Sequence, residues 1–230
     1  MKCVILQPSY IPWRGYFHQI EKADLFVFYD DVQYDRRGWR NRNKIKTAKG
    51  ALWLTIPVYA RGVQQSKTAI NEIQIVNDDD DWNETHWKSI ELAYHKAPFF
   101  NDYAFLINEF YQRKPTYLAD FTIETTIALA YQLGINNTDF ICSSTLEVEG
   151  SKTERLINIL QKVGATHYIS GPSAKEYIDE VQFIKAGISL EYMAYNYGEY
   201  PQLYPPFDPQ VSILDLLFMT GPQALTYITS

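Results

Sequence analysis

The chain has 230 residues, of which 46% are hydrophobic, so it can bury the core of one large domain or two small ones. Its formal net charge of −6 argues against a general nucleic-acid binder. Both cysteines, Cys3 and Cys142, lie in apolar runs, which favours a reducing compartment. The sequence shows neither a signal-peptide pattern nor an apolar run that would span a bilayer, so we expect a cytoplasmic protein without a membrane partner.

Strand-like and helical patterns alternate from the start of the chain. Residues 2–6 predict a strand, about 13–22 a helix, and 25–34 a second strand, which together make a βαβ unit with parallel pairing. The next predicted elements are strands over 51–59 and 70–76, and helices over 82–96, 98–113 and 115–134. The aspartates at 78–81 are explained by the helix that follows them, and their spacing does not fit a metal-binding loop.

The second half repeats the alternation. Its predicted elements are strands over 139–146, 166–171 and 188–195, and helices over 151–164, 174–187 and 212–221. Another βαβ unit therefore lies in the C-terminal half. We predict an α/β fold with a mostly parallel sheet flanked by helices, as a single domain over 1–230 with a candidate helical insertion around 82–134.

A basic segment, residues 33–50, holds seven of the 21 basic side chains against one acid, Asp35. It is either a solvated loop or a binding site for a small anion. Arginine is suited to phosphate, asparagine adds neutral donors and Trp39 offers a face for stacking, so we favour a nucleotide, a nucleotide-sugar or another phosphorylated ligand. The candidate ligand contacts here are Gln33, Trp39, Arg40, Asn41, Arg42 and Asn43.

The stretch "QPSYIPWRGYFHQI", residues 7–20, follows the first strand directly. Parallel sheets bind ligands at the carboxyl ends of their strands, so this stretch and Asp30, at the end of the second strand, would face the same region. The predicted binding side chains of this stretch are Gln7, Tyr10, Trp13 and Tyr16. We assign proton transfer to His18 or Asp30. The alternative interpretation is that the aromatic side chains fill an ordinary core.

These residues also carry a family resemblance. "ILQPSYIPWRGYFHQIEKADLFVFYDDVQYDRRGWRNRNKIKT" resembles the opening of the WbqC-like family, and the likeness continues in "HWKSIELAYHKAPFFNDY", "KTERLINILQKVGATHYISGPSAKEYID" and "YPQLYPPFDPQVSILDLLFMTGP". The resemblance implies a bacterial protein of surface-polysaccharide (O-antigen) biosynthesis. It suggests an enzyme that modifies a nucleotide-linked amino sugar, with transfer of an aminoacyl group such as glycine as one activity. The alternative is a non-catalytic subunit that binds a nucleotide or nucleotide-sugar in the same pathway. No cofactor or metal is expected.

Two further places were considered for ligand contacts. A fainter likeness to nucleotidylyl transferases gives Ser151, Thr153 and Arg155 beside the free N–H groups of a predicted helix start, although an ordinary helix cap explains them as well. Ser170 and Gly171 follow a predicted strand, where they form either a ligand-approach turn or a plain turn. The sequence contains no G-x-S-x-G elbow, so a hydrolase triad is not expected, and it does not indicate an oligomeric state.

Overall fold

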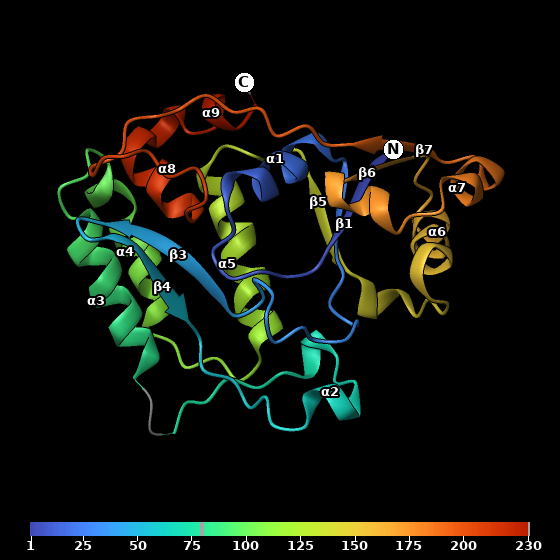
Figure 1. Cartoon of the computed structure of the whole chain (residues 1–230), viewed down its shortest axis with the longest axis horizontal. Helices are drawn as coiled ribbons and strands as arrows, with labels where there is room; N and C mark the ends of the chain where they lie inside the picture. Colours follow the sequence, from blue (N-terminus) through green and yellow to red (C-terminus); the bar gives the residue numbers. More distant parts are fainter. Residues whose placement is uncertain (79–80, 230) are drawn as a thin grey trace.

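The fold is built on a central sheet of five parallel strands (Figure 1). A computed structural model describes residues 1–78 and 81–229. The strands are β1 (Lys2–Leu6), β2 (Leu25–Phe28), β5 (Asp139–Cys142), β6 (His167–Ser170) and β7 (Ser189–Tyr192), in the order β5-β2-β1-β6-β7. Numbered one to five along the chain, they lie in the order 3-2-1-4-5. This is the strand order of a doubly wound sheet, and the order reverses between β1 and β6.

Helices cover both faces of the sheet, as predicted. The flanking helices are α1 (Arg14–Lys22), α5 (Leu118–Gln132), α6 (Lys152–Lys162) and α7 (Glu180–Ala186). Successive strand side chains point to opposite faces, so Val4 packs in the cluster of α1 and α5, whereas Cys3 and Ile5 pack in the cluster of α6 and α7. Both predicted βαβ units are therefore confirmed.

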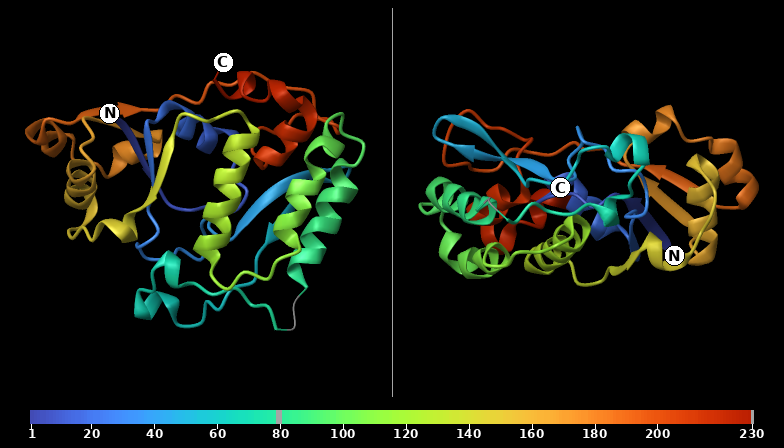
Figure 2. Two further views of the ribbon diagram at one scale, coloured as in Figure 1. Left: turned by 180° about the vertical axis from the view of Figure 1, so that it is seen from behind. Right: turned by 90° about the horizontal axis from the view of Figure 1, so that it is seen from below.

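A second group of elements lies at the end of the molecule opposite α7 (Figures 1 and 2). Here β3 (Arg42–Thr47) and β4 (Gly50–Thr55) form an antiparallel hairpin outside the main sheet. Against β3 pack α3 (Trp82–Tyr94) and α8 (Ile213–Thr220), and α4 (Phe100–Tyr111) packs against both of these helices. One core cluster runs from the sheet through these helices. The hairpin is therefore attached to the same core as the sheet.

Short elements complete the chain. They are α2 (Val63–Ser66), α9 (Thr226–Thr229) and the 3₁₀ turns η1 (Ile70–Glu72), η2 (Ser143–Leu146), η3 (Pro172–Glu176) and η4 (Gly221–Gln223). Across residues 1–78 and 81–229, no helix is both long enough and apolar enough to cross a bilayer. The same residues contain no group of three or more side chains arranged to hold a metal ion.

Several predicted elements differ in the structure. The strand over 70–76 is wrong: η1 forms instead, and the Ile75 and Val76 N–H groups bind the carbonyls of Thr116 and Pro57 in separate loops. The predicted strand over 51–59 is shorter and belongs to the hairpin. The basic segment, for which no strand was predicted, contributes β3 to the same hairpin.

Two other predicted elements have different bounds in the structure. The helix predicted over 174–187 is broken, because the Asp179 side chain accepts a hydrogen bond from the Val181 N–H and caps a new helix there. The strand predicted over 139–146 ends at Cys142, where η2 begins. Asp79 and Asp80 of the acidic run lie outside the described residues.

Candidate functional site

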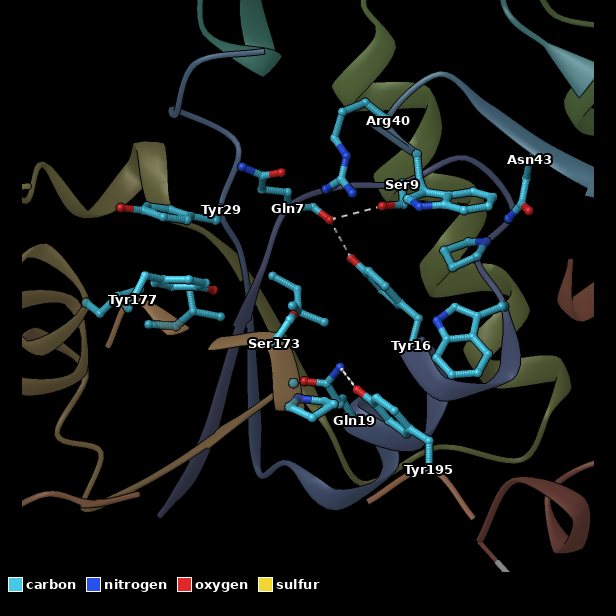
Figure 3. A pocket seen from close by; sticks show the side chains of 18 of the residues that line it. Gln7, Ser9, Tyr16, Gln19, Tyr29, Arg40, Asn43, Ser173, Tyr177 and Tyr195 are labelled. Atoms are coloured by element: carbon cyan, nitrogen blue, oxygen red, sulfur yellow. Dashed lines mark hydrogen bonds between the residues drawn. The ribbon is translucent and has the colours of Figure 1, made fainter. Parts of the chain in front are cut away.

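A cavity of about 1070 Å³ opens at the carboxyl ends of β1 and β6 (Figure 3). Ile5, Leu6 and Gln7 line it from the end of β1, and Gly171 lines it just after β6. These two strands flank the point at which the strand order reverses. Open α/β sheets bind their ligands at such points, so the topology alone marks this cavity as the candidate site.

The loop after β1 reaches the cavity in a strained conformation. Ile11 has a φ of 35°, a left-handed value that a β-branched residue rarely adopts. The side-chain amide of Asn43, on β3, donates to the carbonyls of Tyr10 (3.2 Å) and Ile11 (2.8 Å). The Tyr10 N–H in turn donates to the carbonyl of Trp39 at 3.2 Å. The basic segment therefore holds the first loop in place, which joins two of the regions that the sequence predicted to meet.

One face of α1 forms a wall of the cavity. Trp13, Tyr16 and Gln19, spaced three apart, line it together. The ring of Trp13 packs so closely over Gly15 that an added Cβ there would collide with it. Trp13 also meets Tyr195 edge to face, with 5.0 Å between ring centroids, and Gln19 Nε2 donates to the Tyr195 hydroxyl at 2.7 Å. The aromatic residues of the first turn are thus divided between the cavity wall and the core.

Arg40 places a positive charge in the cavity (Figure 3). Within residues 1–78 and 81–229 its guanidinium forms no hydrogen bond and no ion pair, and its Nε is buried without a partner. Burial lowers the pKa of Arg40, and the nearby Tyr16, Asp35 and Tyr34 oppose that shift. The side chain is half-buried, and its buried Nε lacks a partner, so the guanidinium is suited to receive an anion.

Arg42 begins β3 and does not line the cavity. Its guanidinium carbon is 4.8 Å from the centroid of the Trp53 ring, and Nη2 donates to the carbonyl of Arg37 at 2.9 Å. Trp53 stacks on Trp39, with 5.3 Å between centroids. Alternation along β3 therefore separates residues that are close in sequence, because Asn43 turns inward and Arg42 outward.

The structure brings some of the predicted site residues together and not others. Those that line the cavity are Gln7, Trp13, Tyr16, Trp39, Arg40, Asn43 and Gly171. Those outside its lining are Tyr10, His18, Asp30, Gln33, Asn41, Arg42, Ser151, Thr153, Arg155 and Ser170.

The two predicted proton carriers, His18 and Asp30, are both in the second group. His18 Nδ1 lies 2.8 Å from the Tyr197 hydroxyl, away from the cavity, and burial lowers the pKa of the imidazole. Asp30 is buried and accepts hydrogen bonds from the Ser144 N–H (3.0 Å), the Ser144 hydroxyl (2.6 Å) and the Ser143 hydroxyl (3.1 Å). Asp30 therefore fixes the start of η2 against β2.

Tyr10 is fully buried in the core. Its hydroxyl lies 2.6 Å from that of Tyr111 and 2.8 Å from Nδ1 of His86. Asn41 is buried as well, and its amide donates to the carbonyl of Ile56 at 2.8 Å. Both side chains hold the framework of the site and do not face its interior.

The remaining contacts outside the cavity are local. Thr153 accepts from the Asp179 N–H at 3.1 Å, and the Ser170 hydroxyl lies 3.4 Å from that of Tyr168. Gln33 forms an isolated antiparallel bridge with Ala69. Ser151 precedes α6 without the side-chain cap that was weighed for it.

Arg155 forms an ion pair that the sequence did not suggest. Its Nη2 lies 2.5 Å from the Asp31 carboxylate, which also accepts from the Ser143 hydroxyl at 2.5 Å. The guanidinium of Arg155 is therefore neutralised by a carboxylate, in contrast to that of Arg40.

Several polar and aromatic side chains of the cavity were not predicted from the sequence. These are Ser9, Gln19, Tyr29, Lys152, Tyr168, Ser173, Tyr177, Tyr195 and Gln210. Position at a strand end was a usable signal for Tyr29, which follows β2. None of the described residues that line the cavity is a histidine, cysteine, aspartate or glutamate. The walls carry amides, hydroxyls, aromatic rings and basic groups.

The fold and the cavity are those of a doubly wound α/β protein, a class that holds small ligands where its strand order reverses. Within that class the chain belongs to the WbqC-like protein family, whose model matches residues 7–227. It is 42% identical over 229 residues to "Uncharacterized protein Rv1507c" of Mycobacterium tuberculosis (strain ATCC 25618 / H37Rv), and the alignment covers 99% of this chain and 97% of that protein. No solved structure matches the chain.

Proposed function

We propose that the cavity binds a nucleotide-linked amino sugar, or another phosphorylated sugar, during the assembly of a bacterial surface polysaccharide such as O-antigen. The observation that carries the proposal is the unpaired Arg40 guanidinium in a large cavity at the reversal of the strand order. Membership of the WbqC-like family supports the pathway.

The cavity has the size and chemistry for such a ligand. At about 1070 Å³ it is at the upper end of small-molecule sites, which suits a ligand with several linked parts. Arginine binds phosphate oxygens through two parallel N–H groups, and the aromatic walls from Trp13, Trp39 and Tyr16 favour flat or ring-shaped groups.

The reaction proposed is aminoacyl transfer. The neutral amine of the sugar attacks the carbonyl carbon of an activated glycyl donor, a C–N bond forms, the bond to the donor's leaving group breaks and the nitrogen loses a proton. The sugar supplies the nucleophile and the departing group of the donor takes up the proton, so the protein needs only to position both substrates. The amides and hydroxyls of the described lining are suited to that positioning.

A second candidate is a non-catalytic binding subunit of the same pathway. The observation that favours it is the lack of any histidine, cysteine or carboxylate among the described residues of the lining, because these groups carry most acid–base and covalent catalysis. For either candidate we place the protein in the cytoplasm, where nucleotide-sugars are made. The two free cysteines support that location.

Thermal denaturation and calorimetric titration with a panel of nucleotide-sugars and sugar 1-phosphates test the proposal. A ligand at about 100 times its dissociation constant adds about 2.7 kcal/mol to the free energy of unfolding. The Arg40→Gln variant should lose this effect, whereas Arg42→Gln, outside the cavity lining, should keep it. The proposal fails if no phosphorylated sugar stabilises the wild-type protein.

Mass spectrometry then separates the two candidates. A bound amino sugar is incubated with glycyl thioester and glycyl ester donors, and the product is sought as a glycyl amide. Formation of the amide only in the presence of the protein supports the enzyme. Tight binding without any product supports the binding subunit.

A further inference from the structure

The cavity has two chemically different ends (Figure 3). Arg40 and Ser9 lie toward one side of the view, Tyr29 and Tyr177 lie on the opposite side, and Gln7 lies between them. Tyr29 directly follows β2, and Tyr177 follows η3, beyond β6. Elements from both halves of the sheet therefore supply the aromatic end.

Tyr29 lines the cavity and is supported by Arg155. The guanidinium carbon of Arg155 lies 5.3 Å from the centroid of its ring, and the ion pair with Asp31 holds that arginine in place. Tyr29 lines the cavity and Arg155 does not, so this arginine supports the Tyr29 side chain from outside the cavity.

Tyr177 is an exposed aromatic side chain at the same end. It is 66% exposed, and among the described residues its ring contacts no other aromatic ring or cation. The pKa of Tyr168 is raised, mainly by burial and to a smaller extent by the nearby hydroxyls of Tyr177 and Tyr29. This agrees with a position of all three tyrosines at the same end of the cavity. Tyr168 itself is stacked on the Phe183 ring, with 5.6 Å between ring centroids and 10° between ring planes. The floor of the cavity at this end is therefore well packed.

We propose that Tyr29 and Tyr177 hold the base of a nucleoside diphosphate, which orients the ligand with its phosphates toward Arg40. This inference rests on the proposed function and adds the ligand class and its direction. A nucleobase is flat and can stack on an aromatic face whatever its identity, and these two residues offer flat faces without a fixed charge. Phosphates need a cation, which the opposite end provides through Arg40.

Fragments of the ligand test the two ends separately. Calorimetric titration uses three kinds of probe: nucleosides (uridine, adenosine and guanosine), nucleoside diphosphates (UDP, ADP and GDP), and glucose 1-phosphate, which has no base. The variants are Tyr177→Ala, Tyr177→Phe and Arg40→Gln. Tyr131→Ala is the matched control, because Tyr131 is 50% exposed on α5 and does not line the cavity.

We expect Tyr177→Ala to weaken binding of the preferred nucleoside diphosphate and its nucleoside by roughly 5- to 150-fold, the usual loss when one stacked base loses its aromatic partner. Binding of glucose 1-phosphate should be unchanged. Tyr177→Phe, which keeps the ring, and the Tyr131 control should bind like the wild type. Arg40→Gln should weaken both phosphorylated probes and leave the nucleoside unaffected.

Each contrary result has a distinct meaning. If Arg40→Gln weakens the phosphorylated probes while Tyr177→Ala changes none of them, the base site is wrong and the proposed function stands. If Tyr177→Ala weakens glucose 1-phosphate as much as the diphosphate, a sugar occupies this end and the proposal is overturned. If the wild type binds no phosphorylated probe, the proposed function fails and the inference with it.

Discussion

Replacement of Arg40 by methionine should make the protein more stable and its ligand binding weaker. The Nε of Arg40 is buried without a hydrogen-bond partner, which typically costs about 1–3 kcal/mol for such a group. Methionine keeps an apolar side chain of similar reach and removes the unpaired polar atoms. We therefore expect the free energy of unfolding to rise by about 1–3 kcal/mol and the melting temperature to rise by about 2–4 °C for each kcal/mol.

Urea denaturation of the free protein measures the gain, and titration with a nucleotide-sugar measures the loss of affinity, which should be at least about tenfold. Arg42→Met is the control. Arg42 has partners in the Arg37 carbonyl and the Trp53 ring, so this change should lower stability by up to about 1 kcal/mol. A clear loss of stability in Arg40→Met would refute the reasoning, because it would mean that the guanidinium is already well paired in the free protein.

Three more changes follow from the same structure. Burial lowers the pKa of His86 to about 4, so the folded state binds a proton at this histidine less readily than the unfolded state, in which the pKa is about 6.5. The free energy of unfolding should therefore fall by about 2 kcal/mol as the pH is lowered from about 7.5 to 5. The His86→Gln variant should lack that part of the pH dependence in urea denaturation. Asn43→Ala removes two hydrogen bonds to the strained first loop, so it should lower the free energy of unfolding by about 2 kcal/mol and weaken ligand binding. Gly15→Ala forces the Trp13 ring out of its place in the cavity wall, so it should reduce ligand affinity and lower stability by about 1–3 kcal/mol, as followed by titration and denaturation.

Each of these changes has a matched control. His95→Gln replaces an exposed histidine close to the end of the same helix. Asn158→Ala removes one hydrogen bond, which the Asn158 amide donates to the carbonyl of Glu149, whereas Asn43→Ala removes two. The Asn158 variant should leave ligand binding intact. Gly198→Ala adds a Cβ that meets nothing within 4 Å, so both affinity and stability should stay near wild type. Equal effects in a variant and its control would contradict the role given to the first residue.

The sheet could be predicted from the sequence because its strands are short runs with apolar or aromatic residues, and β1, β5 and β6 are each followed by a helix pattern. The hairpin could not, since "RNKIKT" on β3 is mostly polar and has no apolar alternation. That omission also hid the difference between Arg42 and Asn43. Side-chain alternation separates these two neighbours only once a strand is assigned to the segment.

Other parts of the candidate site differ in how far the sequence could have placed them. His18 does not share the three-residue spacing of Trp13 and Tyr16, so helix periodicity already argued against placing it on the same wall. Tyr177 is different: it reaches the cavity because β6 lies beside β1, a pairing that brings together residues far apart in the chain. No local pattern carries that information.

The Arg40 guanidinium comes from the segment before the hairpin, whereas many doubly wound proteins meet phosphate with a glycine-rich turn after the first strand. In this chain that turn holds prolines, aromatic rings and Ile11 in a left-handed conformation. The sheet and the positive charge of the cavity therefore come from different segments of the chain. A relative with a different sequence before its hairpin could accept a differently charged metabolite on an unchanged sheet, and exchange of that short stretch between relatives is a direct route to altered selectivity.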